Sequence, residues 1–448
     1  MAGSGARSIV RFVYQPLLVK DSAASRDCTI IKEKRSCFMG HFADTQRSIS
    51  NERVEYPLKM MHAYPRAIVG WGAHTMVGQE AKNLGMNNAF IVTTGLKGTG
   101  IVEEIQGVLK HAGVESSVYD NVTGNPKDHE VMDGYKQLSA GNFDGFISLG
   151  GGSSTDCCKA IKLVHGHDGQ DVRTFEGAFK ATQPNKLPHI AINTTSGTAS
   201  EVSCFSIINH TDDMYKMALF DPNCTPSLAF NDPVLHQCMT QDIASYTGMD
   251  ALTHAVEAIA SRLLVQSAYG QGLWAIGEIF SNLRQSSANR NNDKAMEQMV
   301  WAQMAAGYSF NSAGLGIVHS MAHVLGGRYD APHGLCNAIG LVDVCRYNLA
   351  ACPERFKMMA KAAGLDTAGM SDYKAGEQFV NAVEELRSEL GIRKNFKDLG
   401  MQAEDLDVCA KGVLNDICTE GNPQDVSFED AKKMFSCCMG EEVDFGNR

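Results

Sequence analysis

The chain has 448 residues, of which 44% are hydrophobic and 20% are charged, and its formal net charge is −11. This length suggests two domains, and the composition is that of an ordinary globular protein. The negative charge argues against a nucleic-acid partner, because binding to phosphates requires a basic surface. No apolar run approaches the roughly 20 residues that span a bilayer, so we expect no membrane partner either.

The N-terminal segment differs from the remainder of the chain. Its first fifty residues contain eight Lys or Arg against four Asp or Glu, and no acid precedes Asp21. Residues 1–55 are therefore predicted to be an N-terminal extension, either a mitochondrial transit peptide or a disordered or family-specific segment. The 14 cysteines include no CxxC pair, which indicates reduced thiols and an intracellular protein, mitochondrial or cytoplasmic.

Residues 56–233 alternate short apolar runs with helical patterns. Ala89–Thr93 and Gly145–Leu149 are apolar enough to be parallel strands buried on both faces. Ile101–His111 and His129–Leu138 between them read as amphipathic helices. Alternation of this kind predicts an α/β domain with an open, Rossmann-like parallel sheet.

A glycine-rich turn follows the second of these strands. Gly151 and Gly152 remove side chains where the backbone must approach a bulky group closely, and Ser153 and Ser154 can cap the next helix. Free N–H groups at a helix start attract phosphate. A lone GGGS turn is weak evidence, since it is also a common way to connect a strand tightly to a helix.

A threonine-rich stretch comes next. Thr194, Thr195 and Thr198 place three hydroxyls beside Gly197, suited to hydrogen bonds with ribose or phosphate oxygens. Threonine is also common at strand ends because of its β propensity.

Residues 234–448 are dominated by long helical patterns, so the second domain is predicted to be all-α. These patterns cover Met249–Leu264, Tyr269–Leu283, Asp293–Phe310, Pro353–Ala363 and Gly376–Leu390.

Histidines are concentrated in one part of this helical region. His319 and His323 are four residues apart in a predicted helix, Ile317–Leu325, and so lie on the same face. Gly326, Gly327 and Pro332 are expected to break the helix, which puts His333 on a loop that can fold back. Such histidines form a plausible half-shell for a divalent metal ion, although each could also be a buried or surface residue without a ligand.

A second segment repeats the four-residue spacing. Asp250 and His254 lie in a helical stretch that opens at Gly248. The two segments together offer one carboxylate and up to three imidazoles, a donor set that suits a first-row divalent ion.

The stretches MDALTHAVEAIAS and GLGIVHSMAHVLGGRYDAPHGLCNA resemble the two metal-binding signatures of the iron-containing (group III) alcohol dehydrogenases. That resemblance implies the dehydroquinate synthase-like fold of the family. It also implies four metal ligands, Asp250, His254, His319 and His333, with His323 unligated as a proton-relay residue. The cation is expected to be Fe²⁺, with Zn²⁺ or another divalent ion suited to the same donors.

The same resemblance assigns the cofactor residues. GGGSSTD is similar to the pyrophosphate-binding motif of the family, with Asp156 as its aspartate, and TTSGTASE is similar to the next cofactor motif. Asn125 lies in a turn that resembles one near the pyrophosphate and nicotinamide, and Lys216 matches a lysine that contacts ribose. Members that prefer NAD usually present an aspartate where this chain has Thr94. The absence of that carboxylate removes a barrier to the 2′-phosphate of NADP, so we expect use of NAD or NADP.

The family resemblance implies an NAD(P)-linked alcohol dehydrogenase or aldehyde reductase that transfers hydride between a small primary alcohol and nicotinamide. Its motifs are closest to the methanol- and propanediol-type enzymes, and family members are commonly homodimers or larger. One alternative is a hydroxyacid–oxoacid transhydrogenase, for which Arg328 is the available carboxylate clamp. A dehydroquinate synthase-like lyase or a non-enzymatic assembly protein would fit the sequence less well.

Overall fold

The computed structural model describes residues 60–443, and all elements named below belong to the unit Lys59–Arg448. The predicted extension of residues 1–55, with its possible transit peptide, lies outside the described residues. Among the residues described, no helix is both long enough and apolar enough to cross a membrane.

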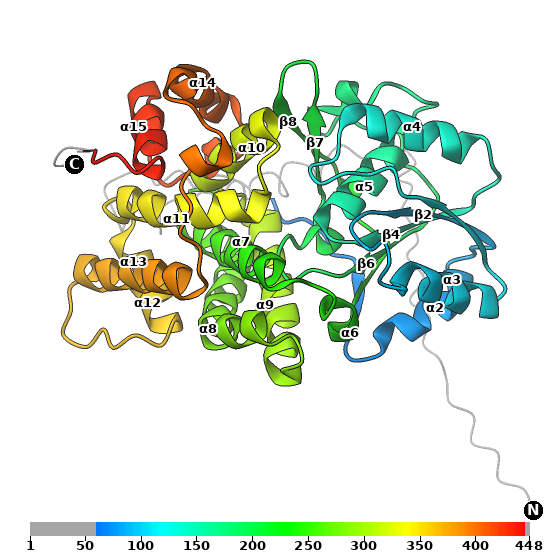
Figure 1. Ribbon diagram of the computed structural model, residues 1–448, viewed down its shortest axis with the longest axis horizontal. Coiled ribbons are helices and arrows are strands. Elements are labelled where there is room, and N and C mark those ends of the chain that lie inside the picture. The colour runs from blue at the N-terminus through cyan, green and yellow to red at the C-terminus, as the bar shows by residue number, and fades with distance from the viewer. Residues whose placement is uncertain (1–59, 444–448) are drawn as a thin grey trace, which may run out of the picture. The chain divides into compact units, whose positions relative to one another are not determined.

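A parallel sheet forms the core of the α/β part (Figure 1). Every neighbouring pair in it is parallel, as the alternating sequence pattern predicted. Its six strands lie in the order β1 (Arg66–Val69), β9 (Leu228–Asn231), β6 (His189–Asn193), β4 (Gly145–Gly150), β2 (Asn88–Thr93) and β3 (Glu115–Tyr119).

Both faces of this sheet are buried. Along β2, Phe90 and Val92 join one apolar cluster, whereas Ala89 and Ile91 join the opposite one, because successive side chains of a strand point to opposite faces. One face is covered by α4 (Asp128–Ser139) and α5 (Gly152–Gly166), the other by α2 (Val77–Asn83) and α3 (Ile101–His111). The predominantly apolar composition of β2 and β4 follows from this double burial.

A second, three-stranded sheet was not predicted from the sequence. Its strands lie in the order β5 (Gly177–Ala178), β8 (Tyr215–Phe220) and β7 (Phe205–His210), and β7 and β8 form an antiparallel hairpin. This hairpin packs against α10 of the helical part.

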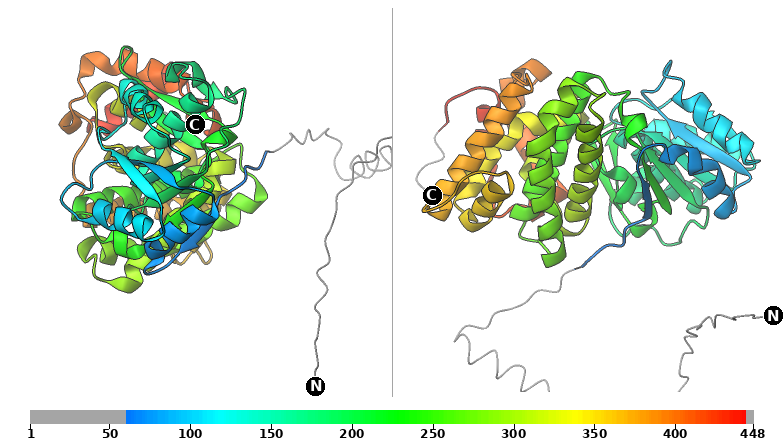
Figure 2. Two further views of the ribbon diagram at one scale, coloured as in Figure 1. Left: turned by 90° about the vertical axis from the view of Figure 1, so that its right-hand side faces the viewer. Right: turned by 90° about the horizontal axis from the view of Figure 1, so that it is seen from below.

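After β9 the chain is helical throughout its described length, which confirms the predicted fold class. The helices gather on the side of the sheet opposite α2 and α3 in the views of Figures 1 and 2. They are α6 (Pro233–His236), α7 (Gln241–Ala260), α8 (Gln266–Ala288), α9 (Asp293–Ala313), α10 (Ile317–Tyr329), α11 (His333–Leu349), α12 (Pro353–Ala362), α13 (Asp372–Glu389), α14 (Leu406–Asn415) and α15 (Phe428–Cys438).

Candidate active site

Helix α7 carries Asp250 and His254 in the middle of its length rather than near its start. It begins at Gln241, where the hydroxyl of Thr240 accepts a hydrogen bond from the Ile243 N–H at 3.2 Å, so the predicted start at Gly248 was too late. Asp250 and His254 are both buried and lie one turn apart on the same face.

The other three histidines lie on two consecutive helices. His319 and His323 face inward from α10, as predicted, but this helix continues through both glycines to Tyr329. It ends where Asp330 adopts a left-handed backbone conformation with φ 53°. His333 is therefore the first residue of α11 and not a loop residue, which corrects the sequence prediction.

One carboxylate oxygen is surrounded by three imidazoles. The Oδ1 atom of Asp250 lies 3.6 Å from Nε2 of His319, 3.7 Å from Nε2 of His333 and 3.8 Å from Nε2 of His254. Atoms of Asp250, His319 and His333 all lie within 4.8 Å of one another. Four ligands that surround a cation at about 2.1 Å are separated by roughly 3.4 Å in a tetrahedron. The separations of 3.6–3.8 Å from Asp250 are close to this value, but His254 lies outside the group of three whose atoms are all within 4.8 Å of one another.

The pKa values of Asp250, His254 and His333 suit a metal site, whereas His319 would lose a ring proton when a cation binds. Burial lowers the pKa of His254 to about 4 and that of His333 well below its usual range, so both rings are neutral at pH 7 and can offer a lone pair. Burial would raise the pKa of Asp250, but the neighbouring histidines outweigh it and lower that pKa. For His319, burial is outweighed by hydrogen bonds to Asp250 and Glu257, which raise its pKa to about 9.

The amide of Asn337 also faces the predicted ligands. Its Nδ2 atom lies 2.6 Å from Oδ1 of Asp250, 3.2 Å from Nε2 of His333 and 3.3 Å from Nε2 of His319. The carboxylate oxygen and the two imidazole nitrogens thus surround one electropositive NH₂ group. A bound cation would take its place as their partner. The Oδ1 atom of Asn337 is buried and has no hydrogen-bond partner among residues 60–443. The residues present therefore fit a divalent cation.

Two carboxylates that were not predicted from the sequence lie against the Nδ1 atoms of two of these histidines. Glu257 of α7 lies 2.6 Å from Nδ1 of His319, and Asp416 lies 2.8 Å from Nδ1 of His323. Glu257 lies three residues beyond His254 and so on the same helical face as Asp250 and His254, and this helical pattern could have indicated it. Asp416 is 93 positions from His323, and no local pattern in the sequence connects the two.

The two predicted cofactor motifs meet at the carboxyl ends of β4 and β6. A Cβ atom on Gly151 would lie 3.0 Å from the side chain of Thr195, and one on Gly152 would lie 2.8 Å from that of Thr198. The Thr194 N–H donates to the carbonyl of Gly150 at 3.1 Å. These glycines therefore allow the two loops to pack closely at the start of α5.

The serines of the glycine-rich turn do not cap α5. The capping position is Gly151, without a side-chain hydrogen bond, and Ser153 is the second residue of the helix. The hydroxyl of Ser154 instead accepts the Thr94 N–H at 3.0 Å. The start of this 15-residue helix thus keeps N–H groups that no side chain caps, which suits a phosphate.

Asp156 organises the protein beneath this loop. Its carboxylate accepts hydrogen bonds from the Ser200 hydroxyl at 2.5 Å and from the Ile207 N–H at 3.1 Å. It therefore ties α5 to the chain that leads into β7. The Thr94 hydroxyl, at the end of β2, donates to the carbonyl of Val122.

Lys216 extends from β8 to the junction of the α/β and helical parts. Its ammonium donates to Oδ1 of Asn125 at 2.7 Å, and the amide of Asn125 donates to Asp330 at 2.9 Å. A Cβ atom on Gly326 would lie 2.4 Å from Cε of Lys216, and one on Gly327 would lie 2.5 Å from Cα of Tyr215. The two glycines therefore allow close approach of β8 and do not break α10.

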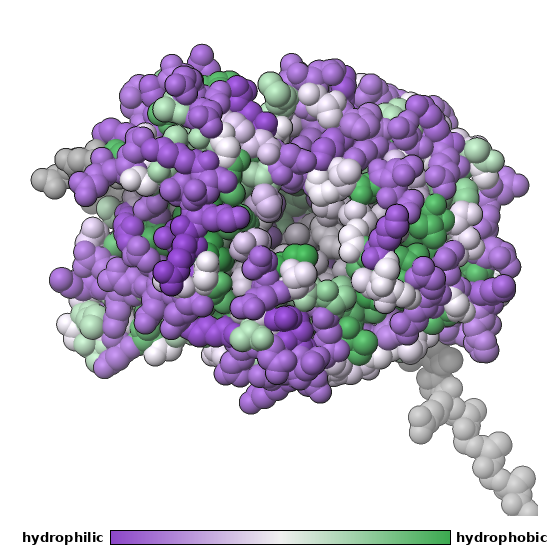
Figure 3. Space-filling model, in the orientation of Figure 1, coloured by the Kyte–Doolittle hydropathy of each residue, from purple (hydrophilic) through white to green (hydrophobic). Residues whose placement is uncertain are grey.

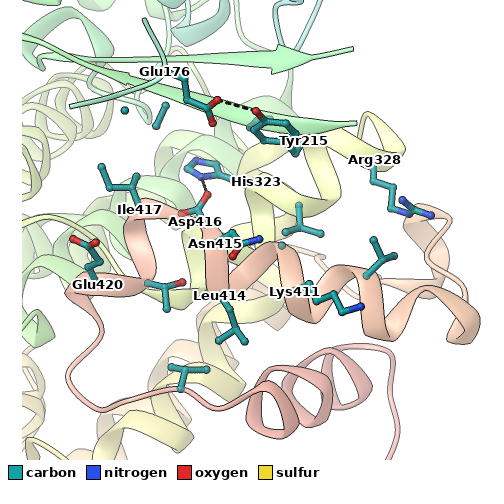
Figure 4. Close-up of a pocket in the computed structure, with 18 of the residues that line it drawn as sticks. Glu176, Tyr215, His323, Arg328, Lys411, Leu414, Asn415, Asp416, Ile417 and Glu420 are labelled. Atoms are coloured by element: carbon teal, nitrogen blue, oxygen red, sulfur yellow. Dashed lines mark hydrogen bonds and ion pairs between the residues drawn. The ribbon is translucent and has the colours of Figure 1, made fainter. Parts of the chain in front are cut away.

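A cavity of about 940 Å³ opens beside His323. Figure 4 shows His323 pointing from α10 toward Asp416, with Arg328 and Lys411 farther along the wall. His323 also stacks on His333, with ring centroids 5.6 Å apart, so its ring lies between the predicted ligands and this cavity. In Figure 3 the face is hollowed at its centre, where the α/β and helical parts meet.

Two family models match the two parts of this chain. The family model described as iron-containing alcohol dehydrogenase matches residues 65–233, and that of the Fe-containing alcohol dehydrogenase family, C-terminal, matches residues 244–439. Methanol:N,N-dimethyl-4-nitrosoaniline oxidoreductase of Amycolatopsis methanolica is 38% identical, covering 87% of this chain and 97% of that protein. 1,3-Propanediol dehydrogenase of Citrobacter freundii is also 38% identical, covering 82% and 95%.

Solved structures agree with these sequence relatives. The crystal structure of a 1,3-propanediol oxidoreductase superposes with a TM-score of 0.82 at 36% identity, over 85% of this chain and all of the other (100%). An alcohol dehydrogenase from Oenococcus oeni gives a TM-score of 0.81 at 36% identity, over 84% and 99%. The chain therefore belongs to the iron-containing alcohol dehydrogenase family, a family of oxidoreductases that act on alcohols.

Proposed function

We propose that this enzyme interconverts small primary alcohols and aldehydes with NAD or NADP, using a divalent cation held by Asp250, His254, His319 and His333. The observation that carries the proposal is the buried Asp250 carboxylate with three imidazole nitrogens 3.6–3.8 Å from one of its oxygens. Fe²⁺ is the expected ion because of the family, and Zn²⁺ suits the same donors.

A bound cation supplies Lewis acidity to the substrate oxygen, and the nicotinamide supplies the hydride donor or acceptor. The protein's own contribution is to position the reactants and to move a proton. His323 lies beside His333 without being assigned as a ligand, and Asp416 fixes its ring through Nδ1. We propose that Nε2 of His323 exchanges the proton of the substrate hydroxyl with water in the adjoining cavity.

The proposed cofactor site is the carboxyl end of the parallel sheet. The pyrophosphate would bind the start of α5 through Gly151, Gly152 and Ser153, with Thr194, Thr195 and Thr198 on the neighbouring loop. Lys216 and Asn125 would meet the nicotinamide end, since both lie at the junction with the helical part.

We further propose that NADP is accepted as well as NAD. The residue at the end of β2 is Thr94, whose hydroxyl already donates to Val122 and carries no charge. A carboxylate there would repel a 2′-phosphate, and this repulsion is absent.

Short alcohols are the proposed substrate class. Relatives that match over most of this chain are named for methanol, 1,3-propanediol and lactaldehyde. A transhydrogenase acting on hydroxyacids is less well supported, because its expected clamp, Arg328, is already bound to Asp405 at 2.7 Å.

The decisive experiment is a panel of short alcohols, aldehydes and hydroxyacids assayed with NADH, NADPH and their oxidised forms on iron-reconstituted enzyme. We expect net formation of NADH or NADPH from a primary alcohol. Hydride exchange between two substrates without net release of reduced cofactor would instead support the transhydrogenase.

Location and assembly are also proposals. A mitochondrial leader in residues 1–55 would be detected as a shortened N-terminus of the mature protein. A homodimer or larger homo-oligomer would be detected by light scattering during size-exclusion chromatography.

A further inference from the structure

Glu257 is a buried acid one helical turn beyond His254 on α7. Its exposed fraction is 5%, and it lies on the helical face that carries Asp250. A carboxylate buried to this degree needs hydrogen-bond partners for both oxygens. Both partners are found at the start of α10.

Each oxygen of this carboxylate has a separate partner. Oε2 lies 2.6 Å from Nδ1 of His319, and Oε1 accepts the N–H of Val318 at 2.7 Å. The capping residue of α10, Gly316, makes no side-chain cap of its own. A Cβ atom on Gly316 would lie only 2.8 Å from Oε1, so glycine is what lets the carboxylate of another helix reach this terminus.

We propose that Glu257 is a positioning residue that fixes the tautomer of His319, so that Nε2 presents its lone pair to the divalent cation. A carboxylate is a pure acceptor, so the ring must place its proton on Nδ1 to make the 2.6 Å hydrogen bond. A cation that binds at Nε2 would displace any proton from that atom and leave the ring neutral with its proton on Nδ1, and Nε2 faces Oδ1 of Asp250 at 3.6 Å. The inference rests on the proposed function, because it presupposes that His319 is a ligand.

The same carboxylate also fixes where His319 lies. Its bond to the Val318 N–H joins α7 to the first turn of α10, next to the histidine that it orients. Two ligands on α7 and one on α10 are thus held in mutual register by a single buried side chain. The hydrogen bond to the Val318 N–H and the effect on the His319 tautomer can be tested separately by substitution.

Glu257→Gln separates the two effects. The amide oxygen can still accept the Val318 N–H, but the amide NH₂ then faces Nδ1, which must become the acceptor and leave the proton on Nε2. Glu257→Ala removes both contacts and leaves Nδ1 free to bond with water. Glu257→Gln should therefore preserve the fold better than Glu257→Ala and yet bind the metal at least as weakly as Glu257→Ala does.

The test measures affinity of the metal-depleted full chain for Fe²⁺ without oxygen, and for Zn²⁺, by competition with a chromophoric chelator. We expect Glu257→Gln to weaken both by about 100-fold, the upper end of what loss of an outer-sphere hydrogen bond costs. Its Tm without metal should stay close to that of the unaltered enzyme, whereas the Tm of Glu257→Ala should fall. Glu201→Gln is the matched control, because Glu201 is also buried, at 1% exposed, and among the described residues its side chain accepts hydrogen bonds from Asn231 and Gln303.

Unchanged affinity in Glu257→Gln, with reduced Tm in Glu257→Ala alone, would overturn the proposal and leave Glu257 as a helix cap only. An equal loss in Glu201→Gln would also overturn it, since any buried carboxylate would then have the same effect. His254→Ala separates this failure from failure of the proposed function. If His254→Ala loses the metal while Glu257→Gln retains it, only the tautomer proposal is wrong; if both retain it, the ligand set is wrong.

Discussion

The paired substitutions Gly326→Ala and Gly327→Ala test how the two halves of the enzyme are joined. Both glycines lie within α10, and neither has a left-handed backbone. Alanine is favoured over glycine inside a helix by about 1 kcal/mol, so in isolation both changes would stabilise α10. Their surroundings differ, and this difference decides the outcome.

At Gly327 the new methyl group meets rigid backbone. It would lie 2.5 Å from Cα and 2.7 Å from the carbonyl carbon of Tyr215, so β8 must move away from α10. Overpacking typically costs about 1–3 kcal/mol, which exceeds the helix gain. We expect a net loss of up to about 2 kcal/mol in the free energy of unfolding.

At Gly326 the new methyl group meets the end of a flexible side chain. It would lie 2.4 Å from Cε and 2.8 Å from Nζ of Lys216. This side chain can swing aside, so stability should change little, but its 2.7 Å contact with Asn125 would be lost. Displacement of the Lys216 ammonium from the proposed cofactor site would also remove its hydrogen bond to the cofactor, and because such a bond from a charged group is worth about 1.5–3 kcal/mol, the KM for NAD should rise by roughly tenfold or more.

The assay combines urea denaturation with steady-state kinetics at varied NAD. The account requires that Gly327→Ala loses mainly stability and Gly326→Ala loses mainly cofactor affinity. A Gly327→Ala variant as stable as the unaltered enzyme would refute the reasoning, because α10 and β8 would then not be held in contact as described.

Three further predictions concern the cofactor and the proton. Thr94→Asp should reduce kcat/KM with NADPH by at least tenfold and leave NADH use nearly unchanged, since a carboxylate repels the 2′-phosphate; an equal loss with both would contradict this prediction. Asp416→Asn and His323→Ala should each retain bound metal and lower kcat, as measured by elemental analysis and turnover, and loss of metal in His323→Ala would show that the histidines are wrongly divided. Burial lowers the pKa of Lys216 to about 8, so its positive charge is present below that pH and lost above it. The KM for NAD should therefore rise with pH through about 8, and Lys216→Arg, whose guanidinium stays charged, should abolish the rise.

Features that depend on local spacing were predictable from the sequence. The apolar runs of β2 and β4 follow directly from burial on both faces, and α3 has the bounds that its periodicity predicted. The four-residue spacing of Asp250 and His254, and of His319 and His323, correctly indicated pairs on one helical face. The grouping of these pairs relied on the family resemblance.

Features that depend on contacts distant in the sequence were missed or misread. Gly326 and Gly327 were interpreted as helix breakers. Their lack of side chains instead makes room for Lys216 and Tyr215, which are more than a hundred residues earlier in the sequence and pack against α10. Because the glycines were expected to break the helix, His333 was predicted to lie on a loop, although it is the first residue of α11. Asp416 could not be found without the fold, because its partner His323 lies 93 positions earlier in the sequence.

Metal analysis of iron-reconstituted enzyme and of the variants Asp250→Asn and His333→Ala tests the central claim most directly. One iron per chain should be found in the unaltered enzyme, together with X-ray absorption typical of nitrogen and oxygen ligands, and both variants should lose the iron and the activity together. A fully active enzyme without metal, or variants that keep their iron, would contradict a catalytic cation held by Asp250 and its three histidines.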